Sequence, residues 1–360
     1  MNEDLPAISH KQFLKVNKNY EKAASLVNLV YVNDKHAGIA RIKRGKNFVY
    51  VFDNKPLKVQ KEIERIRKLA IPPSWTNVWI CAMENGHIQA TGFDMRNRKQ
   101  YRYHALWNML RNETKFHHLY EFGNALPKLR AKVEADIAVK ELTQEKVLAT
   151  VISLMERTYI RVGNYDYEKI YGSYGLTTMK DQHASIKGDE LMFCFKGKKG
   201  VEHKISLKNK RLARIVKECR DIPGRELFQY YDSAGNRKSI DSAMVNNYIK
   251  AATGMDFSAK DFRTWAGSLH ALQAFRAIGE ALTEAEYKKN IVSALDVVSA
   301  RLGNTRTVCK KYYVHPGIIK LYEEKQLAKY LEELNKPLKE HNVPGLTNEE
   351  IVLLKILKAA

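Results

Sequence analysis

The chain has 360 residues, of which 44% are hydrophobic and 28% are charged, so its length predicts a globular protein of about two domains. Lysine and arginine number 61 against 40 aspartate and glutamate, which leaves a formal charge of +21 at pH 7. This excess favours a polyanionic partner, most commonly nucleic acid, although ribosome-associated and heparin-binding proteins share the same balance.

The spacing of the cysteines and the lengths of the apolar runs indicate the cellular compartment and the kinds of site to expect. Cys81, Cys194, Cys219 and Cys309 lie far apart and form no CxxC pair, which argues against a zinc site or a disulfide framework. The first residues lack the apolar core of a secretion signal, and no run approaches the roughly 18 apolar residues of a membrane span. We therefore expect a cytoplasmic protein without a metal, a cofactor or a membrane contact.

Strand-like patterns dominate the first hundred residues. These patterns lie at residues 48–52, 78–81 and 87–91. A helical pattern over residues 58–69 follows the first of them and is stopped by two prolines, while Asn85 and Gly86 supply a hairpin turn between the other two. These features predict a small, basic, β-rich N-terminal domain over residues 1–108.

Beyond about residue 105 the helical period dominates, and several helix ends carry local signals. Thr143 is placed to cap a helix with a broad apolar face. Thr283 and Glu286 form a capping box ahead of another helix, and Gly303 is placed to end it.

Short strand-like segments interrupt these helices. They lie at residues 176–179, 184–186, 191–195 and 203–207. Residues 196–200, rich in lysine and glycine, form a tight turn between the last two. The tail from residue 317 offers two more helices, the second capped by Thr347 with Glu350. We predict a mainly α-helical catalytic domain with a three-stranded β-sheet over residues 109–360, and hence an α+β chain.

The helical part also holds candidates for the reversible cleavage of a DNA strand. A tyrosine phenolate is a suitable nucleophile and leaving group for phosphate, and arginine forks stabilise the charge that builds on the phosphorane oxygens. A lysine on a projecting turn can protonate the departing 5′ oxygen. The candidates are Arg161 at a helix end, Lys198 at the hairpin tip, Arg263 early in a helix, Asn304 just after a helix end, and the pair Tyr312 and Tyr313.

These segments resemble, in order and spacing, the catalytic blocks of the type IB DNA topoisomerases, with the greatest likeness to the bacterial enzymes related to the poxvirus topoisomerase. The N-terminal signature of that branch is similar to IPPSWTNVWICAMENGHIQATGFDMRNRKQYRYH. Matching blocks run from about residue 38 to about residue 316, and five blocks in order are strong evidence where one would be weak.

The resemblance implies a role for each catalytic candidate. It makes Tyr313 the nucleophile, because the family's tyrosine directly precedes an apolar-x-Pro step; Tyr312 is the alternative. Arg161 and Arg263 become the residues that clamp the scissile phosphate, and Lys198 becomes the general acid.

For the general acid and for Asn304, the residues themselves leave an alternative or a difference from the family. Lys196 or Lys199 would replace Lys198 as the acid if the hairpin register slips. Asn304 stands where poxvirus and eukaryotic members have histidine, and its amide can donate a hydrogen bond but cannot carry charge or shuttle a proton.

The resemblance also implies DNA contacts outside the chemical centre. Gln100, Tyr101 and Tyr103 match family positions that face the DNA major groove, where glutamine can read an adenine edge. Tyr167 matches a phosphate contact.

By this resemblance the protein would be a monomer that clamps duplex DNA at the nucleoid and relaxes both supercoil signs through a 3′-phosphotyrosine, without ATP or metal. A tyrosine recombinase uses the same chemistry, but recombinases typically carry histidine three residues before the second arginine, where this chain has Lys260. A non-catalytic basic DNA-binding protein would share the charge but would have no reason to keep the chemical positions.

Overall fold

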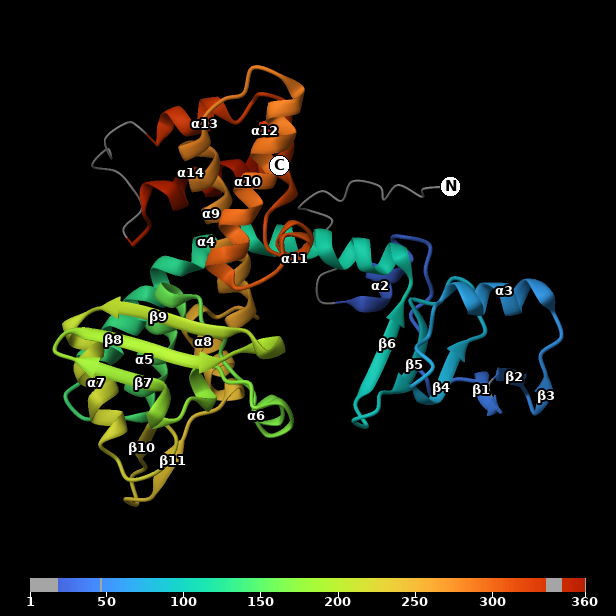
Figure 1. Ribbon diagram of the computed structural model, residues 1–360, viewed down its shortest axis with the longest axis horizontal. Coiled ribbons are helices and arrows are strands. Elements are labelled where there is room, and N and C mark those ends of the chain that lie inside the picture. The colour runs from blue at the N-terminus through green and yellow to red at the C-terminus, as the bar shows by residue number, and fades with distance from the viewer. Residues whose placement is uncertain (1–18, 46, 335–344, 360) are drawn as a thin grey trace. The chain divides into compact units, whose positions relative to one another are not determined.

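The computed structural model describes residues 19–45, 47–334 and 345–359 and divides the chain into two compact units, Met1–His118 and Leu119–Ala360 (Figure 1). A single long helix, α4 (Ala105–Ala138), contains both this division and the domain boundary expected after residue 108. The predicted α+β class is confirmed, with a sheet-rich first unit and a mainly helical second one. None of the described helices is both long and apolar enough to cross a membrane.

The first unit is built on a six-stranded antiparallel sheet in the order β3-β2-β1-β4-β5-β6. Its strands are β1 (Gly38–Arg44), β2 (Asn47–Phe52), β3 (Lys55–Pro56), β4 (Thr76–Cys81), β5 (Ile88–Phe93) and β6 (Lys99–Tyr103). The three strand patterns predicted from the sequence correspond to β2, β4 and β5. The short helix α2 (Tyr20–Ser25) precedes the sheet.

Helix α3 (Gln60–Lys68) closes the core of this sheet, and it confirms the helix predicted over residues 58–69. Its buried residue Ile66 packs against Ile39, Val78 and Ile80 from the strands. The chain leaving α3 is tied back to β1, because Arg41 donates hydrogen bonds to three carbonyl groups between residues 71 and 75. The last strand of this sheet, β6, lies at its edge and leads into α4.

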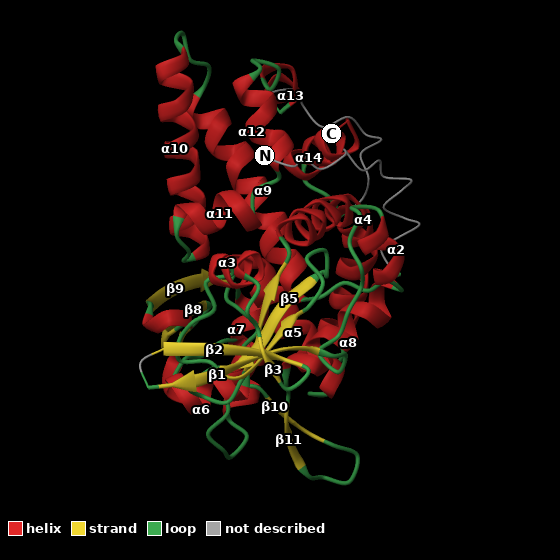
Figure 2. Ribbon diagram, turned by 90° about the vertical axis from the view of Figure 1, so that its right-hand side faces the viewer, coloured by secondary structure: helices red, strands yellow, loops and turns green. Residues whose placement is uncertain are grey.

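The second unit combines a three-stranded antiparallel sheet with many helices, as Figure 2 shows by colour. The sheet consists of β7 (Ala184–Lys187), β8 (Glu190–Lys196) and β9 (Glu202–Lys208). A separate hairpin is formed by β10 (Gln229–Tyr231) and β11 (Arg237–Ser239). Helices α5 (Gln144–Thr158) and α7 (Lys210–Arg220) pack against the sheet (Figure 1). The hydrophobic core runs continuously from the sheet into the helices, and includes Val151, Phe193 and Leu272.

The remaining helices of this unit carry or support the site described below. They are α6 (Tyr165–Tyr171), α8 (Ser242–Thr253), α9 (Ala259–Ile278), α10 (Glu284–Leu302), α11 (Arg306–Tyr312), α12 (Pro316–Glu323), α13 (Ala328–Glu333) and α14 (Asn348–Ala359). The predicted caps are confirmed: Thr143 accepts from the Lys146 N–H, and Thr283 and Glu286 form a reciprocal capping box. Gly303 ends α10 in the left-handed conformation, with φ 58°.

Two expectations for this unit were wrong. Residues 176–179 form a 3₁₀ turn, η1 (Leu176–Thr178), instead of a strand. The Thr178 hydroxyl accepts from the Gly175 N–H while the Thr177 N–H binds the Val162 carbonyl, so the segment is a buried corner. The described part of the tail, residues 317–334 and 345–359, contains three helices instead of two, although Thr347 and Glu350 do cap α14 as predicted.

Candidate active site

Arg161 emerges from a sharp turn at the end of α5. Tyr159 takes a left-handed conformation with φ 58° and closes the helix, and its ring meets His270 edge-on with centroids 4.8 Å apart. The Arg161 carbonyl then accepts from the Leu176 N–H at 2.9 Å, so the η1 corner fixes the backbone. From this position the Arg161 Nη2 donates to the Oδ1 of Asn304 at 2.7 Å.

Arg263 lies in the second turn of α9, whose start is fixed by a capping box between Ser258 and Asp261. The side chain is only 6% exposed. It donates to the carbonyls of Tyr159 and, at 2.6 Å, Leu302, so it links the ends of α5 and α10. Its Nε is buried without a hydrogen-bond partner among the described atoms.

Tyr313 follows α11 and is fixed from the side of α9. A Cβ added to Gly267 would lie 2.5 Å from the Tyr313 carbonyl oxygen, so the tyrosine backbone lies directly against the glycine. The Ser268 hydroxyl donates to the same carbonyl at 3.3 Å and accepts from the His315 N–H at 3.0 Å. One helix therefore holds both Arg263 and, one turn later, the backbone of Tyr313.

The tyrosine side chain faces the arginine pair. Arg263 Cζ lies 5.4 Å from the centroid of the Tyr313 ring. Tyr312, the alternative nucleophile, is 40% exposed and has its ring against the Lys311 ammonium. The geometry thus groups Tyr313, and not its neighbour, with the arginines.

The cluster is strongly cationic. Burial, and then the charge of Arg263, lower the pKa of Arg161 to about 10. Burial also lowers the pKa of Arg263 and raises that of the nearby Cys309 thiol to about 11. Among the described residues, no carboxylate forms an ion pair with either guanidinium. Two unneutralised cations beside a phenol, Arg263 buried and Arg161 partly buried, form a site for an oxyanion such as a phosphodiester.

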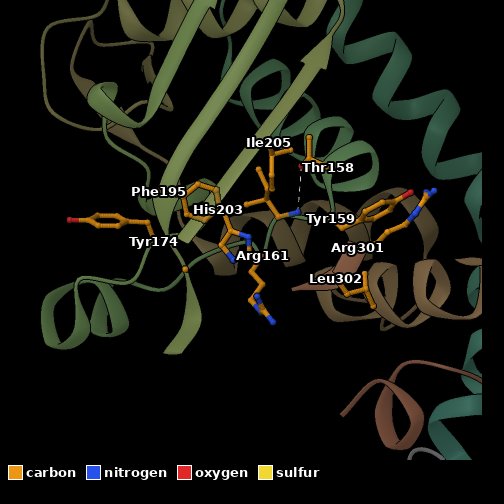
Figure 3. A pocket seen from close by; sticks show the side chains of 11 residues that line it. Thr158, Tyr159, Arg161, Tyr174, Phe195, His203, Ile205, Arg301 and Leu302 are labelled. Carbon is orange, nitrogen blue, oxygen red and sulfur yellow. Dashed lines mark hydrogen bonds between the residues drawn. The ribbon is translucent and has the colours of Figure 1, made fainter. Parts of the chain in front are cut away.

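Lys198 lies on the adjacent hairpin and not in the cluster itself. It begins the turn η3 (Lys198–Gly200) between β8 and β9, where the hairpin tip was predicted, and its side chain is exposed. The preceding residue, Gly197, lines one small pocket together with Arg161, His203 and Leu302 (Figure 3). The structure therefore brings together Arg161, Arg263, Asn304 and Tyr313, and places Lys198 beside them without a hydrogen bond or ion pair to any of the four.

The residues expected to contact DNA are spread over both units. On β6, Tyr101 and Tyr103 are exposed on one side of the strand and stack with centroids 5.7 Å apart. Gln100 is on the other side and donates to Asp94 Oδ2 at 3.0 Å. In the second unit, Tyr167 is exposed on α6, with its ring 5.7 Å from that of Tyr171.

Sequence reasoning missed one residue of this region, His203. It lies on β9 beside Arg161, as Figure 3 shows. The signal was available, because the alternation of β9 puts His203 on the same side as Ile205 and Leu207. Within the described residues, no group of three or more histidine, cysteine or acidic side chains is arranged to hold a metal ion.

Comparison with known proteins gives consistent matches along the chain. A family model of the catalytic core of eukaryotic DNA topoisomerase I matches residues 99–341, and a model of the N-terminal domain of bacterial DNA topoisomerase IB matches residues 47–94. The DNA topoisomerase 1B of Acanthamoeba polyphaga mimivirus is 34% identical over 301 residues, which cover 81% of this chain and 90% of the viral protein. The DNA topoisomerase 1B of vaccinia virus (strain Copenhagen) and the DNA topoisomerase I of monkeypox virus are each 25% identical, over 65% of this chain and 72% of their own.

Proposed function

The chain belongs to the family of type IB DNA topoisomerases, and from this membership we propose that it relaxes supercoiled DNA by transient cleavage of one strand through Tyr313. The observation that carries the proposal is the pair of guanidiniums beside the ring of Tyr313, Arg263 buried and Arg161 partly buried, without carboxylate partners among the described residues. In this arrangement a scissile phosphate would supply the missing negative charge.

The proposed reaction is an exchange of one phosphodiester for another. The Tyr313 phenol oxygen attacks the phosphorus and loses its proton to solvent, the bond to the 5′ oxygen breaks, and Lys198 protonates that oxygen. The products are a 3′-phosphotyrosine and a free 5′ hydroxyl. Because the phosphotyrosine keeps the energy of the broken bond, the hydroxyl can reverse the reaction without ATP. Supercoils of either sign are lost while the free end rotates.

The charged and polar neighbours of Tyr313 have distinct parts in this reaction. Arg161 and Arg263 would each bind nonbridging oxygens of the phosphate and stabilise the extra charge of the pentacovalent transition state. Asn304, at 2.7 Å from Arg161, would orient that guanidinium and donate its own N–H to the phosphate. This set of cations supplies the charge that a divalent metal provides elsewhere, so the reaction would proceed in EDTA.

The protein would act as a monomer that clamps duplex DNA at the nucleoid, with residues 1–108 as a DNA-binding domain and residues 109–360 as the catalytic domain. Exposed stacked tyrosines support a groove contact by Tyr101 and Tyr103. Gln100 lies on the other side of β6, so reading a base edge would require it to give up its hydrogen bond to Asp94 and turn toward the DNA. The exposed phenol of Tyr167 would contact a backbone phosphate.

A plasmid relaxation assay in EDTA without ATP, stopped with detergent, tests the proposal. The wild-type protein should relax both supercoil signs and leave a covalent adduct that maps to Tyr313. Tyr313→Phe should abolish adduct and relaxation, whereas Tyr312→Phe, the matched control one residue away, should retain both. An adduct in Tyr313→Phe, or its loss only in Tyr312→Phe, would refute the nucleophile; DNA binding without either product would favour a non-catalytic protein.

A further inference from the structure

The turn that carries Lys198 is well defined internally. The Gly197 N–H binds the Val201 carbonyl at 2.7 Å, and Lys199 and Gly200 take left-handed conformations with φ 64° and φ 77°. These bonds fix the shape of the turn but not its position relative to the arginines. A general acid must lie within hydrogen-bond reach of the leaving oxygen, so something outside the turn has to hold the hairpin in place.

His203 lies where it can hold the Lys198 hairpin in place. It pairs with Phe195 across β8 and β9, and the two rings stack with centroids 5.0 Å apart at an angle of 20°. The imidazole also fills the space above two glycines. A Cβ on Gly197 would lie 2.6 Å from His203 Nε2, and a Cβ on Gly303 would lie 2.7 Å from His203 Cε1.

These two glycines directly precede Lys198 and Asn304. The imidazole is therefore packed between the backbone that leads into the proposed acid and the backbone that leads into the residue bound to Arg161. Neither contact leaves room for a side chain on the glycine, so the imidazole itself separates the two backbones. The ring also faces the cationic cluster, because Arg161 lines the same pocket.

We propose that His203 is a positioning residue that holds the Lys198 hairpin against the Gly303–Asn304 turn, so that the proton donor is kept at the 5′ oxygen side of the phosphate clamp. This inference rests on the proposed function, since it assumes that Lys198 is the general acid. It differs from a purely structural role, because loss of the ring should affect leaving-group protonation more than phosphate binding by the arginines.

The test measures single-turnover cleavage of two DNA substrates that differ in one atom. One has the ordinary 5′ oxygen at the scissile bond, and the other has sulfur there, which leaves as a thiolate and needs no proton because thiols are far more acidic than alcohols. His203→Ala should cleave the oxygen substrate more slowly by about 10²-fold, the effect of a displacement near 1 Å, and the sulfur substrate at close to the wild-type rate.

Three further variants make the result decisive. Lys198→Ala should show the same selective rescue by sulfur. Ile205→Ala, the matched truncation on the same side of β9 and in the same pocket, should cleave both substrates normally. His203→Phe, which keeps a flat ring, should regain part of the lost rate. A thermal melt of each variant verifies that it is folded.

The possible outcomes distinguish a failure of the positioning role of His203 from a failure of the general-acid role of Lys198. A folded His203→Ala protein that is equally slow on both substrates, or slow on neither, overturns the positioning role. If sulfur still rescues cleavage by Lys198→Ala in that case, the proposed function stands. A Lys198→Ala protein that sulfur does not rescue refutes the general acid, and the inference falls with it.

Discussion

An amide is the side-chain partner of Arg161, and this choice has an electrostatic consequence. Asn304 Oδ1 accepts a hydrogen bond from Arg161 Nη2 at 2.7 Å and does not neutralise the charge of the guanidinium. The pKa of Arg161 is lowered to about 10 by burial and by the charge of Arg263. The folded protein thus keeps one buried and one partly buried cation side by side, and the free-energy cost of leaving them without an anion favours phosphate binding.

Asn304→Asp tests this, because it keeps the acceptor oxygen toward Arg161 but adds a negative charge and removes the N–H donor. The new carboxylate should pair with Arg161, raise the melting temperature, and lower the rate of DNA cleavage by about a hundredfold or more, the size of effect seen for lost oxyanion stabilisation. Stability and activity should therefore move in opposite directions. The measurements are a thermal melt and single-turnover cleavage at fixed salt.

Asn304→Ala is the control for this substitution. It removes the hydrogen bond without adding charge, so it should lower both the melting temperature and the cleavage rate, the latter less than Asn304→Asp does. If Asn304→Asp cleaved DNA as fast as the wild type, the idea that an unneutralised Arg161 binds the phosphate would be wrong.

The side chains of the site were predicted from family resemblance, and their contacts were not predictable from sequence pattern. Arg161 and Asn304 are 143 positions apart, and nothing local in either segment indicates the other. For His203, the alternation of residues along the strand indicated which side of β9 it faces. Its packing against Gly197 and Gly303 was not predictable, because it depends on how β9 meets the end of α10.

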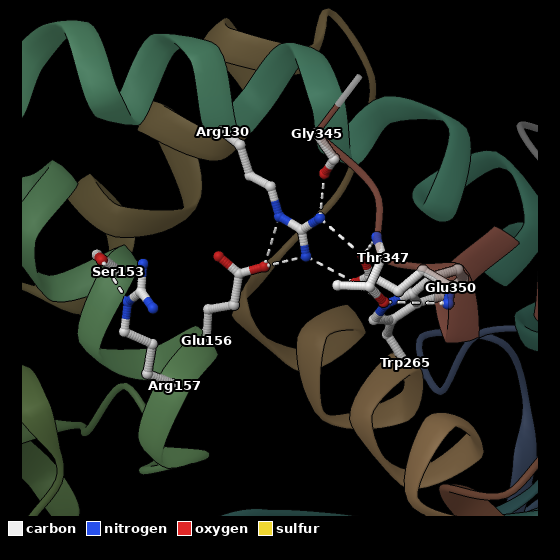
Figure 4. A network of polar contacts seen from close by, with 8 residues as sticks. All are labelled: Arg130, Ser153, Glu156, Arg157, Trp265, Gly345, Thr347 and Glu350. Atoms are coloured by element: carbon white, nitrogen blue, oxygen red, sulfur yellow. Dashed lines mark hydrogen bonds and ion pairs between the residues drawn. The ribbon is translucent and has the colours of Figure 1, made fainter. Parts of the chain in front are cut away.

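At the scale of elements, the C-terminal helix α14 is attached to the catalytic helices by one buried carboxylate (Figure 4). Glu350, only 3% exposed, accepts from Arg130 Nη2 at 2.6 Å, from the Trp265 indole at 3.0 Å and from the Thr347 N–H at 2.9 Å. Burial by itself would raise the pKa of Glu350, but its hydrogen bonds to Arg130 outweigh burial and keep it low. Arg130 also binds Glu156, near the end of α5.

Glu350→Gln should therefore destabilise the second unit. The substitution keeps the shape and the acceptor oxygen but leaves Arg130 with one carboxylate instead of two, so we expect a loss of about 3 kcal/mol in the free energy of unfolding. Chemical denaturation monitored by tryptophan fluorescence would measure it, since Trp265 is itself a partner.

Glu349→Gln is the matched control, one residue earlier on the same helix. Its ion pair with Arg276 is long, 3.8 Å, and partly exposed, so its removal should cost less than about 1 kcal/mol. Equal losses in the two variants would show that the network in Figure 4 adds no more than a surface pair does.

Elements with local signals were predicted well, and those defined by distant partners were not. Thr143, Thr283 and Glu286 cap their helices through bonds that span three residues, so the sequence alone indicates the helix starts. The η1 corner instead depends on a bond from Thr177 to Val162, fifteen residues away. Likewise the attachment of α14 joins residues 220 positions apart.

At the scale of the whole molecule, three buried histidines and one partly buried histidine, His203, connect stability to pH in both units. His87 lies in the first unit, and His183, His203 and His270 lie in the second. Burial lowers the pKa of each of them below the usual 6.5. Nearby cations lower three of these pKa values further: Lys180 acts on His183, Arg161 and Arg263 act on His203, and Arg301 acts on His270. Opposing effects raise the pKa of His183 through Glu168, of His203 through Glu202 and of His270 through Gln273.

The sign of the effect follows from these directions. Between the ordinary pKa of about 6.5 and the lower pKa of the folded state, the unfolded chain binds protons that the folded chain does not, so the free energy of unfolding falls as pH falls through this window. Two of the rings have a specific bond to lose. His87 Nδ1 accepts from the Val32 N–H and His183 Nδ1 from the Lys180 N–H, each at 3.0 Å, and a protonated ring can no longer accept.

We therefore expect the melting temperature to be highest near neutral pH and to fall steadily between about pH 6.5 and pH 5, before the carboxylates titrate. Calorimetric melts over this range measure it. His87→Gln and His183→Gln should each flatten the slope, because glutamine keeps an acceptor but binds no proton, whereas His36→Gln, at an exposed position, should leave it unchanged. A melting temperature that stays constant from pH 7 to pH 5 would contradict the coupling, since four histidines whose pKa values are lowered by folding require the slope.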